Sequence, residues 1–175
     1  RAFVRARDLC EQVGEAPQLL RVLEGLDTVH QTRGEHDRAG ELAEELLRLA
    51  RGTGDAAYLS WAHCKMGITS FWRGEFCRAR EHLEEVINLC EPREQRAPAV
   101  LYSSMDPAVS ALVYLAWTLQ NLGYPDQALT KSRDALVLAQ DLSHPFSQAF
   151  ALNCAARVHG LRGEQAAALE RGEAL

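Results

Sequence analysis

Aromatic, amide and guanidinium side chains of the kind that recognise peptides or small ligands occur in three separate segments of this chain. Aromatic rings supply apolar area that is desolvated on binding, asparagine can pair with backbone or hydroxyl groups, and arginine can hold a carboxylate or phosphate. The alternative is that the rings pack between neighbouring helices, because burial is the usual fate of aromatic residues. The candidate binding residues are Trp61, Cys64, Phe71, Trp72, Trp117, Asn121, Phe150, Asn153 and Arg157.

Other reactive residue types form no pattern that predicts catalysis or metal binding. His63 and Cys64 are neighbours, but adjacent residues of a helix point about 100° apart, so they do not readily share a metal. The five cysteines are widely spaced and contain no C-x-x-C, which indicates free thiols in a reducing cytoplasm. His30 and His159 are expected to pack at the core or its rim. We therefore expect no enzyme activity, no metal and no cofactor.

Composition excludes several partner classes. The 175 residues carry 19 Lys plus Arg against 24 Asp plus Glu, a net charge of −5, whereas nucleic-acid binders usually have a basic surplus. The longest uncharged apolar stretch, Ala111 to Leu119, is shorter than the roughly 20 residues that span a bilayer. The sequence opens without a signal-peptide pattern or an initiator methionine, so we expect a soluble, cytoplasmic piece of a longer protein that binds neither nucleic acid nor membrane.

The elements that would position the candidate residues are indicated by a repeated string. An apolar-periodic segment is followed by glycine, a few polar residues and alanine at 33–39, 73–79, 122–128 and 162–168. The alanines Ala39, Ala79, Ala128 and Ala168 are 40, 49 and 40 residues apart. Self-similarity at this period is typical of a helical solenoid, in which each helix pair buries its apolar stripe against the next.

The segments between these glycines predict helices. From 56 to 72 and from 108 to 122 apolar residues recur at three- and four-residue steps, and good helix formers dominate. We predict an all-α, right-handed solenoid of antiparallel helix pairs in which the small alanines let the two helix axes approach closely. The expected units are the second helix of a partial repeat at 1–14, repeats at 17–54, 55–91 and 107–142, and a last repeat, complete or truncated, at 145–175. Prolines at 92, 98 and 107 mark 92–106 as a long connection that could fold over a groove.

The period and the glycine–alanine punctuation resemble the tetratricopeptide repeat. Placing each turn glycine at the fifteenth repeat position puts Gly67, Ala116 and Ala156 at the small eighth position, although Asp27 stands there in the first full unit. The resemblance implies that positions 2, 5, 9, 12 and 13 of each first helix line a concave groove. In that register all three tryptophans and the other candidate binding residues fall on the groove face.

A second resemblance is carried by the stretches Leu101–Pro107, Gly123–Leu129 and Ser143–Leu152; it covers most of the chain and is densest over residues 101–164. This part is similar to the C-terminal repeats of bacterial proteins that carry a class III nucleotide cyclase domain and a P-loop ATPase domain upstream. The resemblance implies a regulatory arm whose catalytic domains lie elsewhere, because this chain has no G-x-x-x-x-G-K-[ST] loop. We therefore expect a non-catalytic signalling module that binds a peptide or protein partner, or domains of its own full-length chain. The alternatives are a small-molecule effector sensor and a module that self-associates through the ends of the array.

Overall fold

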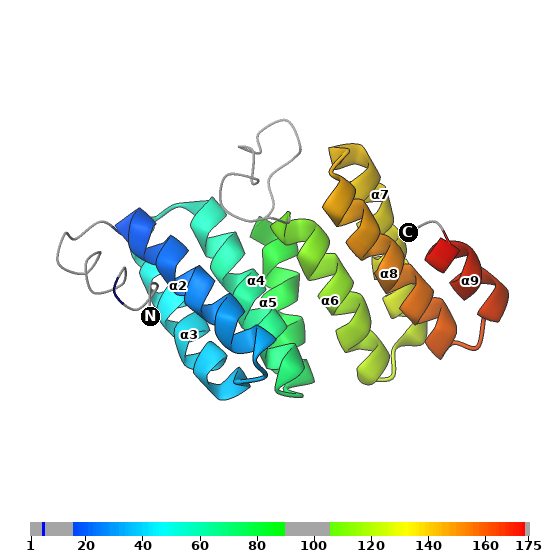
Figure 1. Cartoon of the computed structure of the whole chain (residues 1–175), viewed down its shortest axis with the longest axis horizontal. Helices are drawn as coiled ribbons and strands as arrows, with labels where there is room; N and C mark the ends of the chain where they lie inside the picture. Colours follow the sequence, from blue (N-terminus) through cyan, green and yellow to red (C-terminus); the bar gives the residue numbers. More distant parts are fainter. Residues whose placement is uncertain (1–4, 6–15, 90–105, 174–175) are drawn as a thin grey trace.

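The computed structural model describes Arg5, residues 16–89 and residues 106–173 (Figure 1). These residues form helices joined by short turns and contain no strand, as expected for an all-α chain. The helices are α2 (Ala16–Thr32), α3 (His36–Thr53), α4 (Ala56–Trp72), α5 (Phe76–Leu89), α6 (Pro107–Asn121), α7 (Pro125–Leu142), α8 (Pro145–Leu161) and α9 (Gln165–Glu173).

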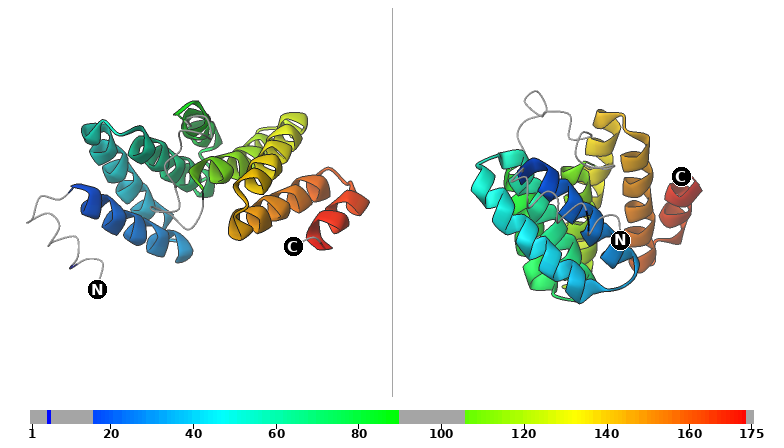
Figure 2. Two further views of the ribbon diagram at one scale, coloured as in Figure 1. Left: turned by 90° about the horizontal axis from the view of Figure 1, so that it is seen from above. Right: turned by 60° about the vertical axis from the view of Figure 1, so that its left-hand side comes forward.

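The helices form antiparallel pairs that stand one after another along the molecule (Figures 1 and 2). The pairs are α2–α3, α4–α5, α6–α7 and α8–α9. The division of the chain into repeats stays a prediction. Its two irregular parts, the partial repeat at 1–14 and the connection at 92–106, lie outside the described residues except for Arg5 and Asp106.

Helix starts are set by side-chain acceptors and by proline. The Asp106 carboxylate accepts hydrogen bonds from the backbone N–H groups of Ala108 and Val109, at 2.9 and 3.1 Å. Pro107 occupies the first turn, where its missing N–H costs nothing. Asp55 caps α4 in the same way through the N–H of Ala57. Each cap satisfies donors that have no partner inside the helix.

The turn inside each helix pair depends on glycine. At the end of α4, Gly74 has φ +76°, and the N–H of Glu75 donates to the Ser70 carbonyl at 2.9 Å while that of Gly74 donates to Phe71. This is the hydrogen-bond pattern of a Schellman motif, which places its left-handed residue just after the helix. Gly34, Gly123 and Gly163 repeat the positive φ at the equivalent turns. The glycines of the repeated string are therefore helix terminators.

Small residues allow the two helices of a pair to lie close together. A Cβ atom added at Gly67 of α4 would lie 2.6 Å from the Cγ and Cδ2 atoms of Leu83 and 3.4 Å from the carbonyl oxygen of Ala79, both on α5. Ala39, Ala79 and Ala128 are completely buried, as their place at the crossing requires. Ala168 is half-buried on α9.

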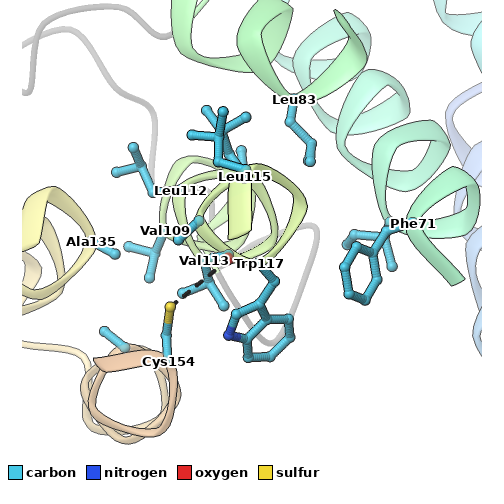
Figure 3. Close-up of a cluster of buried hydrophobic side chains, with 14 of the residues drawn as sticks. Phe71, Leu83, Val109, Leu112, Val113, Leu115, Trp117, Ala135 and Cys154 are labelled. Atoms are coloured by element: carbon cyan, nitrogen blue, oxygen red, sulfur yellow. Dashed lines mark hydrogen bonds between the residues drawn. The ribbon is translucent and has the colours of Figure 1, made fainter. Parts of the chain in front are cut away.

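Two apolar clusters make up the core. One joins α2, α3 and α4 and contains Leu23, Leu46 and Trp61. The other runs from α4 to α8, and Figure 3 shows it around α6, with Leu83 on one side and Ala135 and Cys154 on the other. In this cluster the Cys154 thiol donates to the Val113 carbonyl at 3.8 Å.

A recurring ion pair links neighbouring helix pairs at the surface. Arg73, one residue before the turn glycine after α4, approaches Asp37 of α3 at 3.7 Å, and it also pairs with Glu75 at 3.0 Å. Arg162 occupies the same place after α8 and contacts Asp126 of α7 at 2.9 Å. At the junction between them, the equivalent positions hold Leu122 and Cys77, which cannot form this pair.

Candidate functional site

Five aromatic residues on the first helices of three successive pairs form one continuous cluster. Ring centroids are 5.3 Å apart for Phe71–Trp72, 5.5 Å for Phe71–Tyr114, 5.1 Å for Tyr114–Trp117 and 5.7 Å for Trp117–Phe150. All four of these pairs meet edge to face, which is a preferred geometry for aromatic rings. We call Phe71, Trp72, Tyr114, Trp117 and Phe150 the aromatic cluster.

The cluster has a buried interior and an accessible margin. Phe71 and Trp117 are buried, so they hold α4, α6 and α8 together. Tyr114 and Phe150 are half-buried, and Trp72 is 45% exposed. The ring of His36 stacks on Trp72 at 6.1 Å with only 8° between the planes. An exposed indole held by neighbouring rings offers rigid apolar area to a partner.

The polar groups of the site lie around Trp117. The guanidinium carbon of Arg157 lies 4.9 Å from the centre of the Trp117 ring, a cation–π contact, and Arg157 has no carboxylate partner among the described residues. The Asn121 amide donates to the Trp117 backbone carbonyl at 2.7 Å. The Trp117 indole nitrogen is buried without an acceptor in the described part of the chain. The exposed Arg157 guanidinium is therefore a donor at the margin of the site that a ligand could use.

Tyr114 completes the cluster, although the repeat pattern did not predict it. It stands at the sixth repeat position, one residue after a position expected to face the groove. Burial raises the pKa of its hydroxyl, the hydrogen bond with Trp72 and the charge of Arg157 oppose that rise, and Cys64 adds to it. Tyr114 is thus neutral at physiological pH and contacts groups from all three helices.

The structure gathers six of the nine candidate residues around this cluster. Phe71, Trp72, Trp117, Phe150, Arg157 and Asn121 lie there, and Asn153 is exposed on α8. Trp61 is buried in the other core cluster, with α2 and α3, and is therefore separated from the other two tryptophans. Cys64 is also buried, and its thiol faces the Pro107 carbonyl at 3.6 Å.

The repeat pattern also did not predict a polar network between α2 and α4. Asp27 is completely buried, and its carboxylate lies 3.3 Å from Nζ of Lys65 and accepts hydrogen bonds from the Gln31 amide at 3.0 Å. Gln31 also contacts the Thr69 hydroxyl at 2.9 Å. Burial raises the pKa of Asp27, and Lys65 opposes that rise. The signal in the sequence was a carboxylate at a repeat position that is normally small.

Residues considered for catalysis have structural neighbours. His30 and His159 each contact a glutamate five residues later, Glu35 and Glu164, across equivalent turns. Among the described residues Cys64, Cys77 and Cys154 form no disulfide, and Cys10 and Cys90 lie outside that part of the chain. Among residues 16–89 and 106–173 no three His, Cys, Asp or Glu side chains are grouped so that they could hold a metal ion.

Within the same described ranges, none of the helices combines the length and the apolar character needed to cross a bilayer.

Comparison with known proteins identifies the fold. No protein-family model matches the sequence, and no curated protein matches it either. The structure is similar to BtubC (BKLC) from P. vanneervenii, with 16% sequence identity and a TM-score of 0.76 over 98% of this chain and 68% of that chain.

Two structures of a putative kinesin light chain from Podosopora anserina with nearly identical TPR-like repeats are also similar. One of them, a form with a single substitution, gives a TM-score of 0.69 at 17% identity, covering 98% of this chain and 80% of that chain. The other gives 0.58 at 17% identity, covering 99% and 91%. The chain thus has the fold of a solenoid of TPR-like helix pairs.

Proposed function

We propose that the chain is a non-catalytic interaction module that binds a peptide or protein segment on the face formed by α4, α6 and α8. TPR-like repeats commonly mediate protein–protein interaction, and here the binding surface would be the margin of the aromatic cluster. The observation that carries the proposal is the continuity of the cluster across three helix pairs, with exposed Trp72 near one end and exposed Arg157 near the other.

Each side chain has a distinct role in this proposal. Trp72 and Phe150 supply apolar area that becomes desolvated when the partner binds, and such aromatic anchors commonly dominate interface energetics. Asn121, Asn153 and Arg157 supply polar contacts at the rim. Phe71 and Trp117 maintain the spacing of the helices and do not need to touch the partner.

We further propose that the module belongs to a larger bacterial signalling protein and works in the cytoplasm. The similarity of residues 101–164 to the repeats of cyclase/ATPase fusion regulators supports this context. The partner would then be a separate protein or a domain of the same full-length chain, with no role for nucleic acid or a membrane. Coupling to an output domain requires that the partner bind two conformations with different affinity.

A random peptide library displayed on phage tests the binding face directly. Peptides selected on the chain are synthesised, and their affinities are measured for the unmodified chain and for Trp72→Ala, Phe150→Ala and Arg157→Gln. We expect at least a tenfold loss for Trp72→Ala. Val137→Ala is the matched control, because Val137 is an exposed apolar residue on α7, away from the aromatic cluster. Equal affinity for Trp72→Ala and Val137→Ala, with helicity unchanged, would reject this face.

Self-association is a second candidate, favoured by one observation at the end of the array. Leu161 and Leu169 are 58% and 66% exposed, and an open groove of about 440 Å³ is lined by α8 and α9 residues that include Gly160, Ala168 and Leu169. A second copy of the chain could cover this apolar end. Sedimentation equilibrium decides, because Leu169→Glu should abolish any concentration-dependent increase in mass if this surface is the contact.

A further inference from the structure

Two histidines face each other inside the second helix pair, away from the aromatic cluster. His63 lies on α4 and His82 on α5, and their Nδ1 atoms are 3.0 Å apart. The ring centroids are 5.1 Å apart, with 47° between the planes, and both side chains are half-buried. His63 stands at the fourth repeat position, where the other described repeats have leucine. His63 therefore replaces an apolar side chain of the helix hairpin.

Both imidazoles are held in the neutral form. Burial lowers the pKa of His63, and Arg51 also lowers it while Glu85 acts in the opposite direction. Burial, His63, Arg78 and Arg51 lower the pKa of His82 to about 4. Near pH 7 a single hydrogen therefore lies between the two Nδ1 atoms, on one ring, and the other ring accepts it.

The spacing of the two nitrogens also suits a shared metal ion. With metal–nitrogen bonds of 2.0–2.1 Å, two imidazole nitrogens on one ion are about 3.3 Å apart in tetrahedral geometry and about 2.9 Å apart at adjacent square-planar positions. The observed 3.0 Å lies between these values, so the two nitrogens already have the separation that one shared ion requires.

We propose that His63 and His82 bind one divalent transition-metal ion of the imidazole-preferring class through their Nδ1 atoms. The ion takes the place of the hydrogen between the rings, and that hydrogen moves to Nε2 of its own ring, so each imidazole stays neutral and no proton is released. Nitrogen ligands of this kind suit Zn²⁺, Cu²⁺ and Ni²⁺, whereas Mg²⁺ prefers oxygen.

The surroundings set the strength of the site. Glu85 is the negative group that acts on His63, while Arg51 and Arg78 bring positive charge. The charge of Arg78 is partly neutralised by Glu44 at 2.9 Å and Glu75 at 3.5 Å. Because no third protein ligand is grouped with the pair among the described residues, water would complete the coordination. The site should therefore bind more weakly than a four-ligand structural zinc site.

Calorimetric titration of the chain, made without a polyhistidine tag, with ZnCl₂ and NiCl₂ tests the proposal. We expect one ion per chain, at least a tenfold weaker Kd in both His63→Ala and His82→Ala, and no binding of MgCl₂. The matched control is His30→Ala, which removes a histidine outside the pair and should leave the Kd unchanged. Circular dichroism establishes that each variant is folded, and Asn substitutions replace Ala where it is not.

NMR of the unmodified chain gives a second measurement that needs no variant. Zinc should shift the ring resonances of His63 and His82 before those of the other four histidines. The proposal is overturned by an absence of zinc binding at millimolar concentration, by equal affinity in the His63, His82 and His30 variants, or by first shifts at other histidines.

Discussion

The carboxylate of Asp27, which is completely buried on α2, lies 3.3 Å from the ammonium nitrogen of Lys65 on α4, whose side chain is 14% exposed. The pair joins the first two helix pairs through a polar contact at a repeat position that is small in the later units. Removing one partner of a buried ion pair leaves a charge without compensation, which is far more costly than removing both.

Lys65→Met should therefore lower the free energy of unfolding by about 3–5 kcal/mol, measured by urea denaturation. Lys131→Met is the matched control, because Lys131 pairs with Asp134 at the surface, 3.2 Å away, and such pairs contribute less than about 1 kcal/mol. Similar losses in the two variants would show that the Asp27 charge is solvated.

The loss in Lys65→Met should also depend on pH. Burial already raises the pKa of Asp27 and Glu24, and Lys65 limits both rises. A carboxyl group with a raised folded-state pKa contributes stability that is complete below its unfolded pKa and is lost as pH rises. Without Lys65 the pKa values rise further, so the difference from the unmodified chain should be large near pH 7 and shrink toward pH 4. A pH-independent difference would contradict this.

Gly67→Ala should destabilise the chain by about 1–2 kcal/mol, because the overlap with Leu83 outweighs the better helix propensity of alanine. Leu83 is completely buried and cannot move aside freely. Gly52→Ala on α3 is the control, since an added Cβ would have no neighbour within 4 Å there, and it should be neutral or stabilising. Thermal unfolding of the two variants measures the contrast.

Ser143 ends α7 in the left-handed region, with φ +52°, where Gly54 with φ +68° ends α3. Ser143→Gly should raise the free energy of unfolding by about 0.5–1 kcal/mol because glycine adopts this conformation without steric cost. The reverse change, Gly54→Ser, should lower it by a similar amount. Changes of the same sign in the two variants would rule out this explanation.

The thiols should differ strongly in reactivity. Burial raises the pKa of Cys154 to about 12, whereas Cys77 is exposed. Because the thiolate is the reactive form, iodoacetamide at pH 8 should modify Cys77 rapidly and Cys154 only after unfolding in urea. Mass spectrometry of the two cysteine-containing peptides measures both rates, and rapid modification of native Cys154 would show that its surroundings open.

Much of the fold could be predicted because its signals are local. Turn glycines, capping aspartates and buried alanines each act within one helix pair, and their recurrence indicated stacked pairs of helices. The accessibility of the candidate site could be predicted less well. Trp61 occupies a repeat position expected to face a groove, but α2 and α3 pack over it in the core.

Contacts between pairs depend on the superhelical arrangement, which no local pattern contains. Asp27 and Lys65 are 38 residues apart in sequence and belong to different helix pairs. Tyr114 was missed for the same reason, since its neighbours come from α4 and α8. These contacts could have been found by searching the sequence for chemically complementary residues about one repeat apart.

The recurring arginine–aspartate contact has a consequence for building longer versions of this protein. The first helix pair carries both partners itself, because Arg33 occupies the place of Arg73 and is followed by Asp37, whereas the second pair has Arg73 followed by Cys77. Tandem copies of residues 16–54 would therefore place an arginine opposite an aspartate at every new interface between copies. Copies of residues 55–89 would bring the cation alone, and the designer would have to supply its counterpart.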